Sequence, residues 1–284
     1  TAVRSRLGDA SPMVRFAAFR VACSELRLEK KTLFHDVADL LKRIPYEAEN
    51  VRAHVLKAAE GTLFSVQSSQ ETLQRVTALA AEKEVSEQSL RDLLGAHRTS
   101  QGEEAFCASM KAVAIDAVKH LQSLGQTADP RAVALVLEQV SAECPAALHD
   151  HVVTLHSWIK VPADAPVARR VVAQQACRIL TNALPGWATS AKKAMVMRLG
   201  EHIQDSLCTL LEAPELNLVR AATTCFCKLA LNGIVDAEDF LGHFNESLAH
   251  LRHAVEHRVP LDAISQRRIC RLAWIVASTL EFMD

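Results

Sequence analysis

Four histidines in the C-terminal part of the chain have the spacing that could hold a metal ion on one face of a helix. They lie within fifteen residues of one another, at His243, His250, His253 and His257. Steps of three, four and seven residues return to the same side of an α-helix, and imidazole is a common ligand of zinc and nickel. The His-Glu-x-x-His motif of zinc hydrolases, with its glutamate directly after the first histidine, does not occur in this stretch. We therefore expect a solvated face, beside Glu246, Arg252 and Glu256, and no stoichiometric metal.

Two further groups of reactive residue types have the wrong spacing for joint chemistry. The run His149–His151 is consecutive, so on a helix its side chains point about 100° apart. Together with His156 it is interpreted as a surface helix end. Cys225 and Cys227 are separated by one residue, which is neither the thioredoxin spacing nor the zinc-ribbon spacing. We expect no catalytic or redox role for either group.

The chain also lacks the glycine-rich loops on which most phosphate and oxyanion chemistry depends. Only nine glycines occur among 284 residues, without a Gly-x-Ser-x-Gly elbow, a phosphate-binding loop or a dinucleotide fingerprint. We therefore predict that the chain is not an enzyme and has no catalytic residue, resident metal or cofactor.

Basic residues are balanced by acidic ones over the whole chain but gather in local clusters. With 32 Lys and Arg against 33 Asp and Glu, the net charge is −1, so only a local patch could bind nucleic acid. Several clusters stand at predicted helix ends or turns, where stacked repeats could align them into a ridge that neutralises phosphates. The candidate contacts to DNA phosphates are Lys42, Arg43, Arg169, Arg170, Lys192, Lys193, Arg198, Arg267, Arg268 and Arg271. Alternatively, each cluster is an ordinary solvated surface charge.

The elements that must position these residues are predicted to be helices. Ala, Leu and Val fill most apolar positions, and they recur at helical spacing. In Ala105–Leu124, for example, one stripe contains Phe106, Val113, Ala117 and Leu121. No apolar run approaches the roughly 20 residues that span a bilayer, which predicts a soluble protein. The eight scattered cysteines are typical of reduced thiols in the cytosol or nucleus.

A recurring Val-Arg pair marks a degenerate repeat. The pairs are Val14-Arg15, Val51-Arg52 and Val219-Arg220, and each follows a proline. The first step is 37 residues, close to the roughly 40-residue period of HEAT repeats, in which two antiparallel helices form one unit. The valine is expected to pack inward. The arginine is expected to reach acidic groups of a neighbouring repeat.

Each pair opens a predicted apolar face. The faces are Val14, Ala17, Ala18 and Val21; then Val51, Val55, Ala58 and Ala59; and then Val219, Ala222, Thr223 and Phe226. Turn or helix-stop signals separate the helices, Leu184-Pro185-Gly186 among them, and Ser86 is an expected N-cap. We predict an all-α fold, an α-solenoid of HEAT-like antiparallel helix pairs and a fragment of a longer array. N-terminal repeats are expected over 1–69, middle repeats over 70–160 and C-terminal repeats over 161–284.

Several of these segments, taken in order, are similar to those of a known family. In the C-terminal half they are Arg170–Leu184, a helix ending in a Leu-Pro turn; the Glu-led helix Glu201–Leu211; Val219–Ala230 (VRAATTCFCKLA); Phe240–His253 (FLGHFNESLAHLRH); and Arg268–Asp284 (RICRLAWIVASTLEFMD). Upstream they are Asp9–Val21 and Leu40–Phe64. In order and pattern the chain resembles the HEAT-repeat cohesin loader family, also called Nipped-B or adherin.

The resemblance implies a hook-shaped, non-enzymatic solenoid that loads the cohesin ring onto chromosomes in the nucleus. Its partners would be cohesin subunits, a smaller loader subunit and duplex DNA bound without regard to sequence, and it would stimulate the ATPase of cohesin. The His-rich stretch Asn245–His257 stands where the family has a more basic segment. Two other functions stay open: another HEAT or armadillo scaffold (a transport receptor, a phosphatase scaffold or a condensin- or cohesin-associated subunit), and a metal-dependent hydrolase using the four histidines.

Overall fold

The computed structural model describes residues 2–26, 33–64, 68–82, 85–123, 130–162, 165–191, 193–258 and 263–280. Over these ranges every regular element is a helix, so the all-α prediction is confirmed. The chain divides into two compact units, Thr1–Ala147 and Leu148–Asp284. The predicted division into three parts stays a prediction, and the boundary between the two units lies inside its middle part.

In its described part the first unit contains α-helices of 5 to 20 residues. They are α1 (Ala2–Arg6), α2 (Pro12–Leu26), α3 (Leu33–Arg43), η1 (Ile44–Tyr46), α4 (Glu49–Leu63), α5 (Ser69–Ala80), α6 (Glu87–Gln101), α7 (Glu103–Gln122) and α8 (Pro130–Glu143), where η denotes a 3₁₀ helix. The 3₁₀ helix η2 (Pro145–His151) follows α8.

The described α-helices of the second unit have 8 to 24 residues. They are α9 (Val152–Ile159), α10 (Val167–Ser190), α11 (Lys193–Leu211), α12 (Leu216–Leu231), α13 (Ala237–Glu256) and α14 (Ala263–Leu280). In the described part of the chain, no helix is both long and apolar enough to cross a membrane.

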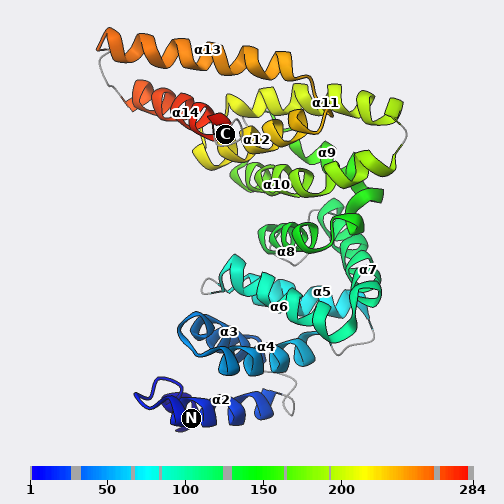
Figure 1. Ribbon diagram of the computed structural model, residues 1–284, viewed down its shortest axis with the longest axis vertical. Coiled ribbons are helices and arrows are strands. Elements are labelled where there is room, and N and C mark those ends of the chain that lie inside the picture. The colour runs from blue at the N-terminus through cyan, green and yellow to red at the C-terminus, as the bar shows by residue number, and fades with distance from the viewer. Residues whose placement is uncertain are drawn as a thin grey trace. The chain divides into compact units, whose positions relative to one another are not determined.

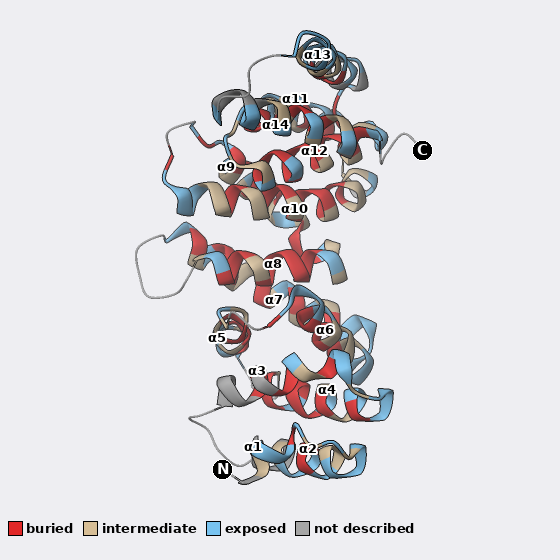
Figure 2. Ribbon diagram, turned by 90° about the vertical axis from the view of Figure 1, so that its left-hand side faces the viewer, coloured by how far each residue is buried: buried red, intermediate tan, exposed pale blue. Residues whose placement is uncertain are grey.

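Within each unit the helices stack in two layers (Figure 1). In the first unit α2, α4, α6 and α8 pack on one another in succession, and α3, α5 and α7 do the same beside them. In the second unit α10, α12 and α14 form one succession, while α9 packs on α11 in the other layer and α13 covers α14. Buried residues lie mainly where the two layers face each other (Figure 2). Within each unit this packing is consistent with a solenoid, in which each helix pair contacts mainly its neighbours.

Local chemistry fixes several helix boundaries. The Ser86 hydroxyl accepts a hydrogen bond from the backbone N–H of Ser89, which confirms the predicted N-cap of α6. Gly102, at φ 80°, separates α6 from α7. Gly233, at φ 65°, ends α12 in a Schellman motif, because its N–H bonds to the Ala230 carbonyl and that of Ile234 bonds to the Leu229 carbonyl.

Two of the three predicted apolar faces are confirmed, and the third is confirmed only at Ala18. The predicted residues of α4 and α12 are all at most 5% exposed, as are those of the α7 stripe. In α2, by contrast, Val14 and Val21 are 38% and 46% exposed, and the core is reached by Ala18 and Phe19. Phe19 buries far more apolar surface than either valine, so the helix turns its larger side chain inward.

The predicted helix stop at Leu184-Pro185-Gly186 is also wrong, because α10 continues to Ser190 with Pro185 inside it. The same finding corrects the Leu-Pro turn expected from the family resemblance. Leu184 is fully buried and Trp187 is 7% exposed. The packing of these two side chains stabilises the helix across Pro185, although proline removes one backbone hydrogen bond.

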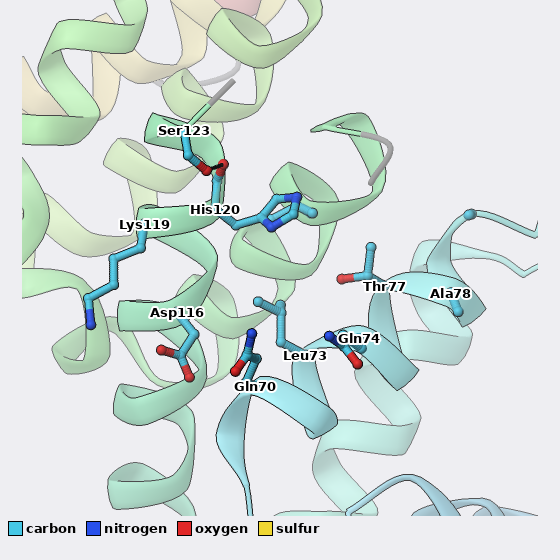
Figure 3. A pocket seen from close by; sticks show the side chains of 11 residues that line it. Gln70, Leu73, Gln74, Thr77, Ala78, Asp116, Lys119, His120 and Ser123 are labelled. Carbon is cyan, nitrogen blue, oxygen red and sulfur yellow. Dashed lines mark hydrogen bonds between the residues drawn. The ribbon is translucent and has the colours of Figure 1, made fainter. Parts of the chain in front are cut away.

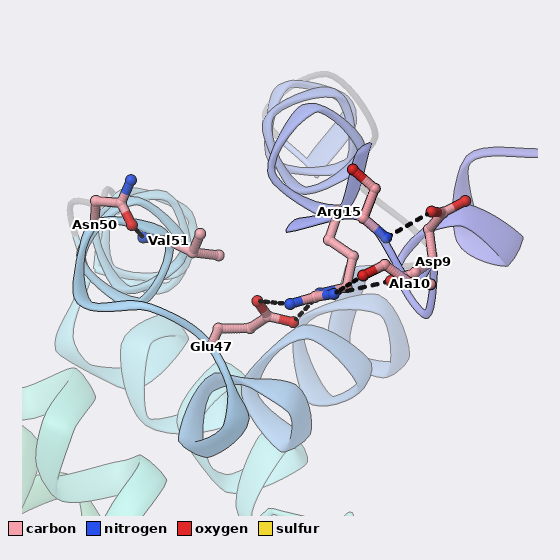
Figure 4. Close-up of polar contacts among 7 residues, drawn as sticks. Asp9, Ala10, Arg15, Glu47, Asn50 and Val51 are labelled. Atoms are coloured by element: carbon pink, nitrogen blue, oxygen red, sulfur yellow. Dashed lines mark hydrogen bonds and ion pairs between the residues drawn. The ribbon is translucent and has the colours of Figure 1, made fainter. Parts of the chain in front are cut away.

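Ion pairs between an arginine and an acidic residue join stacked helices in both units, and those of Arg15 and Arg52 are the ones that the Val-Arg pattern predicts. In the first unit the Arg15 guanidinium forms two bonds with Glu47, at 2.8 and 3.3 Å, and also donates to the Asp9 and Ala10 carbonyls (Figure 4). We call the set the arginine ladder: Arg15–Glu47, Arg52–Asp92, Arg98–Glu143, Arg170–Glu215 and Arg271–Glu212. Arg220 departs from the expectation, since it lies over the Trp274 ring at 4.8 Å.

Candidate binding surfaces

The predicted DNA contacts that the structure describes are spread over both units. Lys42 and Arg43 occupy the last turn of α3, and of these Lys42 is exposed. In the second unit Arg169, Arg198 and Arg267 are exposed, on α10, α11 and α14 respectively. Lys192 lies outside the described residues, as do the side chains of Lys193 and Arg268.

Arg170 and Arg271, two further predicted DNA contacts, bind the turn between α11 and α12. Arg170 pairs with Glu215 at 2.7 Å and donates to the Ala165 carbonyl at 2.5 Å. Arg271 pairs with Glu212 at 3.1 Å and donates to the backbone carbonyl of the same residue at 3.3 Å. A phosphate would have to displace these carboxylates, so both guanidiniums have a structural role that the sequence analysis did not assign to them.

A groove of about 510 Å³ between α13, α14 and the α11–α12 turn brings two predicted clusters together. His250 of the histidine stripe lines it, as do Arg267 and Arg271 of the basic cluster. Glu212 and Glu246 line the same groove, and Glu246 lies 3.7 Å from the His250 ring. Acidic and basic groups alternate there, which does not favour a phosphate backbone over other polar ligands.

The histidines of α13 form the solvated face that the sequence predicts. His250, His253 and His257 are exposed, and the last two rings have their centroids 4.3 Å apart. The side chain of His243 lies outside the described residues. In the part of the chain that the structure describes, no three side chains of His, Cys, Asp or Glu are grouped to hold a metal ion.

Two other histidines are buried, one at a position where the sequence predicts exposure and one for which the sequence gives no prediction. His156 was expected at a surface helix end but is 6% exposed, with Nε2 3.1 Å from the His202 carbonyl. Its burial lowers its pKa, although the bond to that carbonyl acts in the opposite direction. His97 is 4% exposed, and its Nδ1 lies 2.8 Å from the Glu60 carboxylate. It gave no signal in the sequence because a lone histidine has no spacing to read.

The Cys225 and Cys227 thiols are buried in α12. Burial raises the pKa of Cys225 to about 12 and that of Cys227 to about 11. Thiols this weakly acidic supply little thiolate at neutral pH, and thiolate is the reactive form. Both side chains are also at most 2% exposed, so a reagent in solvent does not reach them, and the arrangement agrees with core packing.

A second groove, of about 860 Å³, lies between α5, α7 and α8 in the first unit (Figure 3). Asp116, Lys119 and His120 line it from α7, and Leu73 and Thr77 line it from α5. Asp116 accepts a hydrogen bond of 2.6 Å from the Ser69 hydroxyl, and the buried Thr77 hydroxyl has no partner among the described residues. The groove thus combines an apolar wall with single donors and acceptors, and no charge of one sign dominates it.

Comparison with known proteins adds no relative: no family model matches the chain, and no curated protein or solved structure matches it significantly.

Proposed function

We propose that the chain is part of a HEAT-like α-solenoid that acts as a non-enzymatic binding scaffold. The arginine ladder is the observation that carries this proposal. It recurs between successive helices in both units, so neighbouring helix pairs are joined by the same kind of contact. Repeat proteins stabilised by nearest-neighbour contacts present long outer surfaces, and they use those surfaces to bind other macromolecules.

The partners we propose are those of the cohesin loader family: cohesin subunits, a smaller loader subunit and duplex DNA. Five of the segments that resemble the family lie on helices here, Arg170–Leu184 on α10 among them. Glu201–Leu211 belongs to α11, Val219–Ala230 to α12, Phe240–His253 to α13, and the described part of Arg268–Asp284 to α14. These segments are thus helical, as the resemblance expects, and the proposal includes stimulation of the cohesin ATPase and a nuclear, chromosome-associated location.

Within this proposal, exposed arginines outside the ladder make the DNA contacts of the second unit. Arg169, Arg198 and Arg267 are exposed, whereas the guanidiniums of Arg170 and Arg271 are already bound to carboxylates. Contacts of this kind neutralise phosphates without reading bases, so binding should be sequence-independent and weakened by salt.

A salt titration of duplex binding tests the DNA contacts. The variant Arg169→Gln/Arg198→Gln/Arg267→Gln should lower the slope of log affinity against log salt by between two and three, at roughly 0.9 per phosphate contact. The matched control, Lys57→Gln/Lys119→Gln/Lys160→Gln, also removes three exposed cations and should keep the wild-type slope. Equal slopes for the wild type and both variants would remove these arginines from the DNA interface.

A binding measurement with purified cohesin tests the choice of partner. The chain should bind purified cohesin subunits at moderate salt and raise the rate of ATP hydrolysis by the intact ring. Binding of DNA without binding of cohesin would contradict the loader proposal and favour another HEAT or armadillo scaffold.

A further inference from the structure

Two thiols from different helices meet in the first unit. The Sγ atoms of Cys107, on α7, and Cys144, the residue after α8, lie 3.2 Å apart although 37 residues separate them in sequence. Cys144 is 3% exposed, whereas Cys107 is partly open to solvent. Neither residue belongs to a spacing motif, so the pair is visible only in the folded chain.

We propose that Cys107 and Cys144 form a modification site, at which a small disulfide of the glutathione type installs an intramolecular disulfide bond. The two sulfurs need to approach to about 2.05 Å, a movement of about 1 Å that side-chain rotation can supply. Cys107 is the residue that the reagent reaches, because it is the more exposed of the two. Cys144 is the residue that completes the bond.

The chemistry proceeds by two exchanges. The Cys107 thiolate attacks one sulfur of the small disulfide, which forms a mixed disulfide and releases one small thiolate. The Cys144 thiolate then attacks Sγ of Cys107, which forms the protein disulfide and releases the second small thiolate. The two protons of the protein thiols pass through solvent to the released thiolates. The protein loses two electrons, and the small disulfide gains them.

The surroundings of the pair make the first exchange slow at neutral pH. The hydrogen bond with Cys144, partial burial and the nearby Glu103 carboxylate raise the pKa of Cys107 to about 12. Glu103 lies 3.6 Å from the Cys107 sulfur and is also paired with Arg98 at 3.3 Å. Thiolate is therefore scarce at pH 7, and its amount grows about tenfold with each pH unit.

The bond would tie α7 to the end of α8. Cys144 stands three residues before Ala147, where the first unit ends. Its backbone N–H already bonds to the Val140 carbonyl at 2.8 Å, and the neighbouring Glu143 carboxylate binds Arg98 of α6 at 3.2 Å. Oxidation would thus add a covalent link at a point where α6, α7 and α8 already converge.

Peptide mapping of the oxidised chain tests the proposal. The full chain carrying Cys270→Ser, which removes an exposed thiol, is incubated with oxidised glutathione, alkylated and analysed by mass spectrometry with and without reduction. We expect a linked peptide pair containing Cys107 and Cys144 as the main oxidised species. Its rate of formation should rise about tenfold per pH unit between pH 7 and 9.

Three variants define the roles of the residues. Cys144→Ala should accumulate glutathione on Cys107, and Cys107→Ala should leave Cys144 unmodified because it is buried. Glu103→Gln should form the linked pair several-fold faster at pH 7.5 by removing the carboxylate beside Cys107. A stable glutathione adduct on Cys107 in the presence of Cys144, or linkage of Cys107 to another cysteine, would overturn the proposal.

Discussion

Consecutive helices α12 and α13 differ in how the rest of the second unit surrounds them. Helix α12 packs on α10, α11, α13 and α14, and nine of its sixteen residues are buried. Helix α13 packs on α14 and α12, and among its described side chains only Phe244 and Ser247 are buried. A helix that is apolar around most of its circumference belongs to the core, whereas one with a single apolar stripe presents its other faces to solvent.

The difference teaches where function can be placed. Substitutions in α12 alter the packing of several neighbours at once, so its Cys and Thr residues are explained by the fold. Substitutions on the outer face of α13 leave most packing intact. The exposed histidines and the groove beside α14 are therefore surfaces that a partner could use without a cost in stability.

The largest difference in the free energy of unfolding should come from substituting two glycines, one beside the core helix α12 and one on α13. A methyl group on Gly200 of α11 would lie 1.9 Å from the Ile234 carbonyl oxygen, in the turn between α12 and α13, whereas one on Gly242 of α13 meets nothing within 4 Å. Gly200→Ala should lower the free energy of unfolding by about 3 kcal/mol, because a backbone carbonyl cannot rotate away. Gly242→Ala should raise it by about 0.5–1 kcal/mol through helix propensity. Urea denaturation of both variants measures the difference, and equal effects would contradict the contrast.

Substituting two glutamates should give a smaller difference in stability between the surroundings of α12 and those of α13. Glu215 precedes α12 and pairs with Arg170, whose side chain is 17% exposed, whereas Glu246 on α13 pairs with His250 at 48% exposure. Glu215→Gln should destabilise the protein by about 1–2 kcal/mol, because a partly buried guanidinium loses its charged partner. Glu246→Gln should stay within about 0.5 kcal/mol of the wild type. Thermal unfolding at two salt concentrations would show whether the order of the two variants holds.

The sequence predicted best where apolar periodicity was strong and a single element was concerned. The faces of α4, α7 and α12 and the Ser86 cap could be read from spacing, because local helix geometry determines them. The inward face of α2 could not, since Val14 and Phe19 compete for the core and only the neighbouring helices decide between them. Pro185 shows the same limit, because side-chain packing overrides a local stop signal.

The candidate sites were predictable only in part, because they depend on contacts between distant residues. The exposure of the α13 histidines followed from their polar neighbours. The sequence did not predict that glutamates of one turn bind Arg170 and Arg271. A cluster of charges in a sequence carries no information about its partners in the fold. The 37-residue separation of Cys107 and Cys144 likewise hid a contact that only the packing of α7 against α8 creates.

A substitution at the N-cap of α13 should show whether α13 opens independently of α12. Asp236 caps α13 by accepting a hydrogen bond of 2.8 Å from the Glu238 N–H. Asp236→Ala should cost about 1 kcal/mol, felt mainly in the first turns of α13 because little packing holds that helix. Hydrogen exchange should therefore speed up in the first turns of α13 and stay unchanged in α12. Equal acceleration in both helices would mean that they open as one unit.

The smallest effect concerns pH and contrasts buried His156 with the exposed histidines of α13. Burial lowers the pKa of His156 below its ordinary value of 6.5, so the folded state holds this ring neutral at pH values where the unfolded chain binds a proton. Its contribution to stability is therefore complete above about pH 6.5 and is lost as the pH falls from there toward the folded-state pKa. His156→Gln should flatten this acid limb of a plot of unfolding free energy against pH. Ser206→Ala removes a polar neighbour 3.3 Å from the ring but keeps the titrating group, so it should lower the curve without flattening it. An unchanged acid limb in the His156→Gln variant would assign the pH dependence to other groups.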